Sequence, residues 1–292
     1  MKEEQKKNRT FRLIRLMAFI LVFIIITPFI VSYAIGDMPD GWFNFRKTGG
    51  IYLFDFPNGS EVYLDGQLKK TTNFIQRDFF VKGLKPNTSY DLSVKKEGYN
   101  NWNKIIKVEP NLVTESSVFS LPIVIPFTEV PQYIVGTKEK KVNTEYTKVS
   151  QVFSKPLSVD YSKDFSSSTI NFSLINLVIK RKSAIWSDGR DIMVRWLGEK
   201  GQEPLMFCEN HVCRTESVVA SLPGTIKKLD FLPGRTDVVV VLVGKDIYAV
   251  EICHNNSKIL QKIYTGTDKA NFIIYNDNIY IKDGVKIGYL EI

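Results

Sequence analysis

The chain has 292 residues, of which 44% are hydrophobic and 24% are charged, and its mean hydropathy is −0.09. These values exclude disordered, collagen-like and polytopic membrane proteins. With only two histidines, His211 and His254, the chain is poorly supplied for zinc sites and histidine-dependent catalysis. Half of the net charge of +8 lies in residues 1–15, and no dense basic run follows, so we expect no nucleic-acid partner.

An uncharged apolar segment occupies residues 16–36, which is long enough to cross a bilayer core of about 30 Å. The basic residues 1–15 precede it, and acidic residues follow it. The positive-inside rule therefore places the N-terminus in the cytoplasm and the C-terminal bulk outside. We predict a single-pass protein of the cell membrane that contacts the lipid bilayer through residues 16–36. A cleaved signal peptide is the alternative, because Ser32-Tyr33-Ala34 resembles a small-x-small cleavage site.

Residues 37–49 are expected to form a linker, and residues 50–122 show short strands joined by tight turns. Apolar and polar residues alternate from Tyr90 to Lys95, which is the period of a strand. Asn58-Gly59 and Asp65-Gly66 are typical of hairpin turns, because both turns require positive φ. The pattern predicts a small all-β sandwich. The expected strands are 51–56, 61–64, 89–95, 102–108 and 113–121.

Several short segments in this region follow one another in an order found in a known family. They are Pro57-Asn58-Gly59-Ser60, Val62-Tyr63-Leu64-Asp65-Gly66, Gly83-Leu84, Tyr90-Asp91-Leu92-Ser93-Val94, Glu97-Gly98-Tyr99 and Trp102. Together they resemble the PEGA domain, over about residues 50–122. The sequence departs from the family pattern at Asn58, at Ser60 and after the Asp65-Gly66 turn. The resemblance implies a small extracytoplasmic β-sandwich, often beside a membrane anchor, without catalytic residues.

The aromatic residues of this region are expected to lie in the core or half-buried on strands. The alternative is a platform on which carbohydrate stacks. The residues concerned are Tyr63, Tyr90, Tyr99 and Trp102.

A proline-containing linker is expected at residues 123–131, followed by a repeat domain at residues 132–292. Residues 183–196 align with residues 228–241, and residues 271–281 form a weaker third copy. A period of 40 to 50 residues with several strands in each unit indicates propeller blades.

The turns Trp186-Ser187-Asp188-Gly189-Arg190 and Pro233-Gly234-Arg235 resemble a turn of TolB-type β-propellers. Closed propellers have four to eight blades, and this region has room for fewer complete ones. We therefore expect an incomplete β-propeller-like domain. A second sandwich remains the alternative.

Cys208 and Cys213 bracket a short loop between expected strands, and an oxidising exterior would favour a disulfide between them. Free thiols are one alternative. A metal site that includes His211 is another, although no fourth ligand is evident. Cys253 is left over as the odd thiol. No catalytic, cofactor-binding or metal-binding residue is proposed. The S-x-x-K pattern from Ser93 to Lys96 falls on an alternating strand, whereas its chemistry needs one turn of a helix. The other common catalytic motifs do not occur.

The sequence as a whole predicts an all-β exterior behind one N-terminal transmembrane helix. The exterior would consist of a small β-sandwich and an incomplete β-propeller-like domain. We expect a non-enzymatic interaction or scaffold protein of the cell envelope, without cofactors, that binds another envelope protein or a polysaccharide. The alternative is an envelope sensor or enzyme with a small-molecule site in the propeller-like domain.

Overall fold

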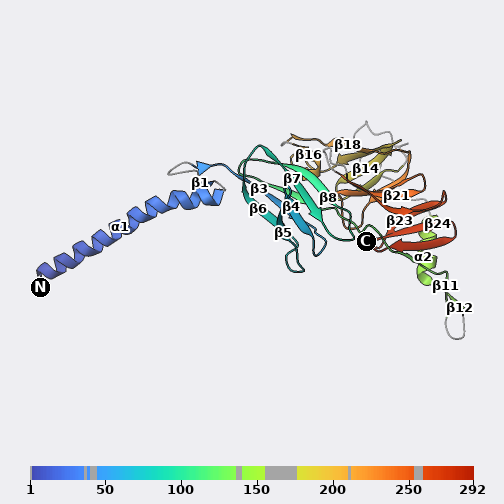
Figure 1. Cartoon of the computed structure of the whole chain (residues 1–292), viewed down its shortest axis with the longest axis horizontal. Coiled ribbons are helices and arrows are strands. Elements are labelled where there is room, and N and C mark those ends of the chain that lie inside the picture. The colour runs from blue at the N-terminus through green and yellow to red at the C-terminus, as the bar shows by residue number, and fades with distance from the viewer. Residues whose placement is uncertain are drawn as a thin grey trace. The chain divides into compact units, whose positions relative to one another are not determined.

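The computed structural model describes residues 2–35, 38–39, 45–135, 140–154, 176–209, 212–252 and 259–292. The chain divides into two compact units (Figure 1). Unit 1 contains Met1–Leu92 and Ile105–Val118, and unit 2 contains Ser93–Lys104 and Phe119–Ile292. Strands dominate the described residues of both units, which confirms the predicted all-β class.

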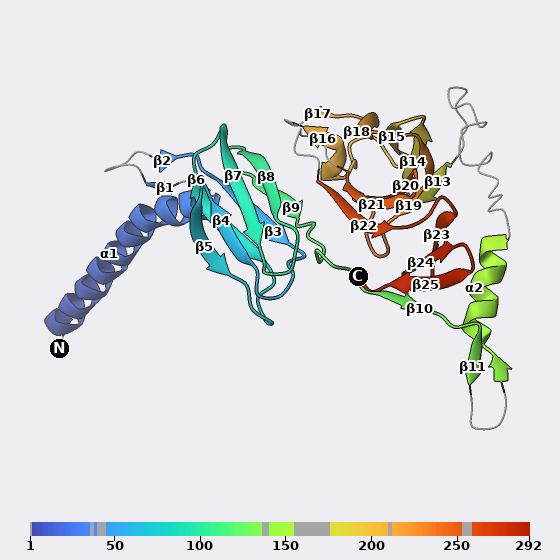
Figure 2. The same cartoon turned by 45° about the vertical axis from the view of Figure 1, so that its right-hand side comes forward.

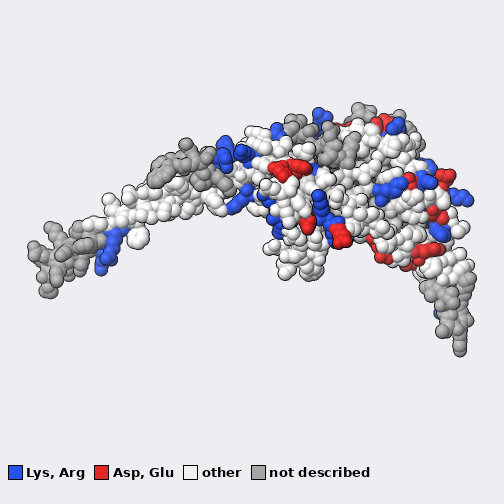
Figure 3. All heavy atoms as spheres, viewed as in Figure 1, with Lys and Arg blue, Asp and Glu red and all other residues white. Residues whose placement is uncertain are grey.

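The chain begins with a long apolar helix, α1 (Lys2–Ile35). Within it, Arg12–Ala34 has a mean hydropathy of 2.7, and its most apolar part is not buried in the protein. Figure 3 shows this part of the helix without the blue and red spheres of charged residues. Pro28 cannot donate a backbone hydrogen bond within the helix. The helix has the length and composition of a membrane span, and a signal sequence near an N-terminus shares these properties.

Two sheets pack as a small sandwich that lies in unit 1, apart from residues 93–95 of β7 and 102–104 of β8, which belong to unit 2. The three-stranded sheet has the order β6-β3-β9, with β3 antiparallel to β6 and parallel to β9. The four-stranded sheet has the order β5-β4-β7-β8. Ile51, Leu53, Val62 and Leu92 are completely buried in the core. The strands are β3 (Gly49–Phe54), β4 (Glu61–Leu64), β5 (Gln67–Thr71), β6 (Phe79–Leu84), β7 (Thr88–Lys95), β8 (Trp102–Val108) and β9 (Val113–Ser117), after a small pair, β1 (Met38–Pro39) and β2 (Phe45–Arg46).

Both predicted turns are present, but only Asp65-Gly66 closes a hairpin, between β4 and β5. The turn at Asn58-Gly59 joins β3 to β4, which belong to different sheets, so the hairpin predicted there is wrong. Gly59 has a φ of 79°, and Asp65 and Gly66 have φ values of 49° and 76°. These left-handed conformations explain why glycine and aspartate stand at these positions. Trp102 is completely buried, and Tyr63, Tyr90 and Tyr99 are half-buried.

Unit 2 contains, among its described residues, three four-stranded antiparallel sheets that succeed one another as propeller blades do (Figure 2). Their strand orders are β13-β14-β15-β18, β19-β20-β21-β22 and β23-β24-β25-β10. The predicted incomplete propeller-like architecture is therefore confirmed. The strands are β13 (Val178–Lys180), β14 (Ser183–Asp188), β15 (Asp191–Trp196), β18 (Glu216–Ser221), β19 (Ile226–Phe231), β20 (Val238–Val243), β21 (Asp246–Glu251), β22 (Leu260–Thr265), β23 (Ala270–Tyr275), β24 (Asn278–Asp283), β25 (Lys286–Leu290) and β10 (Phe127–Glu129).

A helix covers the third sheet where a closed propeller would place another blade. This helix, α2 (Thr144–Ser154), buries Val149 against Ile273 and Ile287 of the sheet. This helix was not predicted from the sequence, because its Thr, Val, Ser, Tyr and Phe residues have low intrinsic helix propensity. Asn143 caps it, since the Asn143 Oδ1 atom accepts a hydrogen bond of 2.9 Å from the Glu145 backbone N–H. A short pair precedes the helix, β11 (Tyr133–Val135) and β12 (Lys140–Val142).

The structure differs from the expected linker at residues 123–131, because β10 lies within it and is the fourth strand of the third sheet. Prolines flank this strand, which is compatible with its position at the edge of the sheet. Gly288 in β25 permits the close pairing, since a Cβ atom there would lie 2.5 Å from the carbonyl oxygen of Thr128. The predicted boundary between the sandwich and the repeat domain stays a prediction, which expression of the two domains as separate fragments would test.

The first copy of the sequence repeat is displaced by one hairpin from the other two. The turns at Pro233 and Asn276 join the first two strands of their sheets, β19 to β20 and β23 to β24. The turn at Asp188 joins the second and third strands, β14 and β15. The matching first turn of that sheet is Arg181-Lys182. Consecutive hairpins of a sheet share the same alternation of apolar and polar residues and the same turn residues. Sequence similarity alone therefore aligned the second hairpin of the first sheet with the first hairpins of the other two sheets.

Candidate functional site

The predicted cysteine pair lies on a two-stranded hairpin in unit 2. The strands β16 (Cys208–Glu209) and β17 (Val212–Cys213) follow the short helix η1 (Leu205–Phe207). The structure joins Cys208 to Cys213 by a disulfide, with a distance of 3.9 Å between the Cα atoms. His211 of the alternative metal site, and the odd thiol of Cys253, lie outside the described residues. Within the described ranges, no three His, Cys, Asp or Glu side chains gather to hold a metal ion.

Unit 1 has an open groove of about 610 Å³ beside β3. We call it the aromatic groove, and its lining residues are Tyr52, Phe54, Asp55, Phe56, Ile75, Arg77 and Asp78. The groove forms because β3 alternates, so that Ile51 and Leu53 point into the core while Tyr52 and Phe54 lie half-exposed on the outer face. The rings of Tyr52 and Phe54 stack with their centroids 5.8 Å apart.

Exposed apolar side chains lie in the groove and beside it. Phe80, which pairs with Tyr52 across the strands, is 53% exposed, and Phe74 and Ile75 are 74% and 89% exposed. Water-exposed aromatic and aliphatic side chains gathered in one place are typical of interaction sites.

Charged groups at the rim of the groove are held in place by neighbours. The hydroxyl of Ser117 donates a hydrogen bond of 2.8 Å to Asp55 Oδ2, and the Arg77 guanidinium lies 5.2 Å from the centre of the Phe74 ring. The groove therefore combines an apolar floor with fixed charges of both signs. This combination provides contact area together with polar groups that orient a partner.

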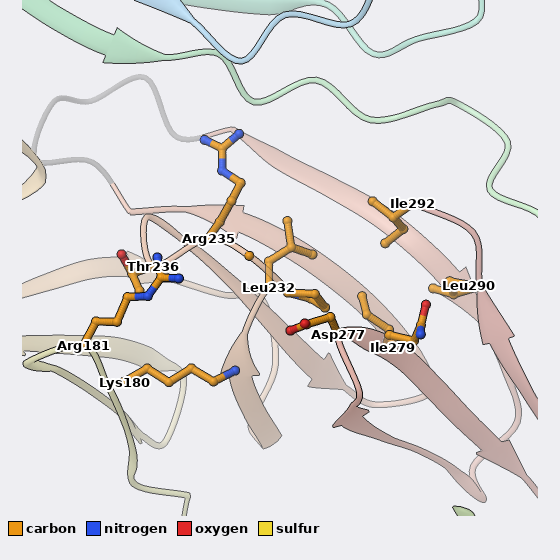
Figure 4. Close-up of a pocket in the computed structure, with 12 residues that line it drawn as sticks. Lys180, Arg181, Leu232, Arg235, Thr236, Asp277, Ile279, Leu290 and Ile292 are labelled. Atoms are coloured by element: carbon orange, nitrogen blue, oxygen red, sulfur yellow. The ribbon is translucent and has the colours of Figure 1, made fainter. Parts of the chain in front are cut away.

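Unit 2 has a second cavity, of about 550 Å³, where the first turns of its three sheets meet (Figure 4). We call it the turn pocket. The turns are Arg181-Lys182, Pro233-Gly234 and Asn276-Asp277. The lining residues are Lys180, Arg181, Leu232, Pro233, Gly234, Arg235, Thr236, Asp277, Asn278, Ile279, Leu290 and Ile292.

The cations of the turn pocket differ in how far they are neutralised. Arg235 is held by both carboxylate oxygens of Asp237, with a distance of 2.9 Å from its Nε to Oδ1. Lys180 faces Asp230 at 3.7 Å, which is too long for a hydrogen bond. Burial raises the pKa of Asp230, and the charge of Lys180 opposes this rise. Arg181 has no ion-pair partner among the described residues.

The fold defines an all-β protein whose two β units follow an apolar N-terminal helix of anchor or signal type. Comparison with protein families identifies the sandwich more narrowly: residues 56–119 are a PEGA domain. This confirms the resemblance given by the sequence motifs. PEGA is an extracellular-type domain. No curated protein matches the chain.

Two solved structures are similar to larger parts of the chain. A quinonprotein alcohol dehydrogenase-like protein from Bacteroides thetaiotaomicron is 13% identical, over 77% of this chain and 46% of that one, with a TM-score of 0.23. The AfRom2 CNH domain is 10% identical, over 77% of this chain and 70% of that one, with a TM-score of 0.26. The chain thus spans about half the length of the first of these proteins. Likeness at this level assigns neither a substrate nor an activity.

Neither cavity was predicted from the sequence. Residues 51–54 are all apolar, so their alternation between core and outer face is invisible in the sequence. The turn pocket did leave a signal, because Lys180-Arg181-Lys182 puts three cations at a tight turn where Asn, Asp or Gly is usual.

Proposed function

We propose that this protein is a membrane-anchored, extracytoplasmic and non-enzymatic interaction protein of the cell envelope. In this proposal α1 spans the membrane with its basic end in the cytoplasm, and both β units lie outside. The PEGA domain, as an extracellular-type domain, and the apolar helix before it support this placement.

The aromatic groove is the observation that carries the binding role. A protein at equilibrium with water gains nothing from presenting Phe74, Ile75 and Phe80 to solvent, unless a partner covers them. The partner is another envelope protein or a polysaccharide, since both offer apolar surfaces together with polar groups for the charged rim. The turn pocket favours the second candidate, a sensor with a small-molecule site in unit 2.

Site-specific photo-crosslinking in intact cells tests the binding role. A photo-reactive amino acid replaces Ile75 in the groove or, as the control, Val285 in unit 2, since the two side chains are 89% and 88% exposed. We expect an adduct from position 75 alone, and weaker labelling when Phe54→Ser is added. Protease and polysaccharide-degrading enzymes then show which kind of partner the adduct contains. Equal labelling at both positions, or none at position 75, would contradict the proposal.

A reporter fused after Ile292 tests the placement of the units. We expect activity from a reporter that works only outside the cytoplasm. Activity from a cytoplasmic reporter in its place would overturn the extracytoplasmic assignment.

A further inference from the structure

The turn pocket contains a backbone conformation that its residue types disfavour. Arg181 and Lys182 have φ values of 45° and 65°, in the left-handed region. Side chains with a Cβ atom rarely adopt this region, apart from Asn and Asp. The matching turns of the other two sheets obey the rule, with Gly234 at 76° and Asn276 and Asp277 at 47° and 56°. Strain of this kind is concentrated at functional sites.

The side chains at this turn place positive charge at the cavity. Lys180 and Arg181 both line the turn pocket, and in Figure 4 Lys180 extends toward the side on which Asp277 lies, while Arg181 extends toward Thr236. The Lys180 Nζ atom lies 3.7 Å from Asp230 Oδ1, and Arg181 makes no ion pair with a carboxylate among the described residues. The guanidinium fork of Arg181 is therefore available to bind two oxygens of one carboxylate or phosphate group.

Other lining residues carry groups of a different chemistry. Thr236, Asp277 and Asn278 present a hydroxyl, a carboxylate and an amide, which pair with the hydroxyl groups of a ligand. Leu232, Ile279 and Leu290 add apolar surface to the lining. A volume of about 550 Å³ suits a small molecule and not a polymer.

We propose that the turn pocket binds a small hydroxylated molecule with one oxyanion group, such as a sugar acid or a sugar phosphate, and that Arg181 holds the oxyanion. The site lies entirely in unit 2 and does not depend on the aromatic groove. Its failure and the failure of the binding role proposed for unit 1 are therefore distinguishable.

Calorimetric titration of the full chain in detergent tests the proposal with four probes: D-glucuronate, D-glucose 6-phosphate, D-glucose and inorganic phosphate. We expect saturable binding of at least one of the two sugar anions. Binding of glucuronate alone would identify a carboxylate ligand, and binding of the phosphate ester alone would identify a phosphate ligand. Absence of saturable heat with both at about 10 mM would overturn the proposal. Equal binding of D-glucose or of inorganic phosphate would overturn it as well.

Two variants of the same turn separate binding from strain. Arg181→Asn and Lys182→Asn each remove one cation and each introduce a residue that tolerates positive φ, so both are expected to raise the thermal midpoint. Lys182 does not line the turn pocket. We expect Arg181→Asn to weaken binding by about tenfold or more, and Lys182→Asn to change it by less than about twofold. Equal losses in the two variants would show a general effect of charge and overturn the role of Arg181.

Discussion

The two units bury their sheets differently, and the difference decides where each can bind a partner. In unit 1 the strand β3 hides one face and leaves Tyr52 and Phe54 on the other. In unit 2 the second strands of the first two sheets, β14 and β20, are buried along almost their whole length. A sandwich keeps a free sheet face for contact with other molecules. Stacked blades expose mainly strand ends and turns to solvent. The turn pocket lies at such turns.

The sharpest test of this contrast places a charge on each kind of face. Val240 in β20 is completely buried, whereas Phe80 in β6 is 53% exposed. We expect Val240→Asp to destabilise unit 2 by several kcal/mol, because an unpaired carboxylate loses its hydration there. Phe80→Asp should cost less than about 1 kcal/mol. Thermal unfolding followed by circular dichroism, with limited proteolysis, measures both. Similar midpoints for the two variants would refute the difference in burial.

The disulfide hairpin of unit 2 provides a smaller effect. We expect removal of both cysteines, Cys208→Ala with Cys213→Ala, to destabilise unit 2 by about 2 kcal/mol, because a short closed loop restricts the unfolded chain only modestly. Protein purified from the native envelope without reductant should carry one reactive thiol after denaturation, that of Cys253. Mass spectrometry of alkylated peptides measures this. Free alkylation of both Cys208 and Cys213 would refute the bridge.

The smallest of these effects concerns the helix that covers the third sheet. The hydroxyl of Tyr280 donates a hydrogen bond of 2.7 Å to Glu145 Oε1 in α2. Tyr280→Phe removes this bond, and we expect a loss of about 1 kcal/mol at neutral pH. Tyr289→Phe is the control, because its hydroxyl makes no hydrogen bond within the described part of the chain.

The loss of unfolding free energy in Tyr280→Phe should depend on pH, and the direction of this dependence follows from the pKa of Tyr280. Burial, together with the hydrogen bond to Glu145, raises the pKa of Tyr280 from 10.0 to about 12. The folded state thus keeps a proton that the unfolded chain releases, so its stabilising contribution is complete below pH 10 and disappears as the pH rises toward 12. The difference in free energy of unfolding between wild type and Tyr280→Phe should shrink over this interval. A difference that stays constant would contradict the assignment.

The structure could be predicted from the sequence where a residue pattern is compatible with only one structural role. Asn58-Gly59 and Asp65-Gly66 can hardly be anything but turns, and Trp102 in an alternating strand belongs in a core. It failed for β5 and β6, where Lys69, Lys70 and Lys82 interrupt the apolar pattern. The candidate sites were even harder to predict from the sequence. Whether Tyr52 or Ile51 meets solvent depends on which face another sheet covers, and this is a property of the tertiary structure.

The pairing of β10 with β25 has a consequence for the order in which the protein can be made. Phe127 pairs with Leu290, so the third sheet joins residues from the two ends of unit 2. During synthesis β10 emerges long before its partner, and until β25 arrives it is an unpaired edge. Closing so long a loop is slow compared with forming the neighbouring hairpins. Completion of unit 2 is therefore delayed until the last residues of this sheet have left the ribosome.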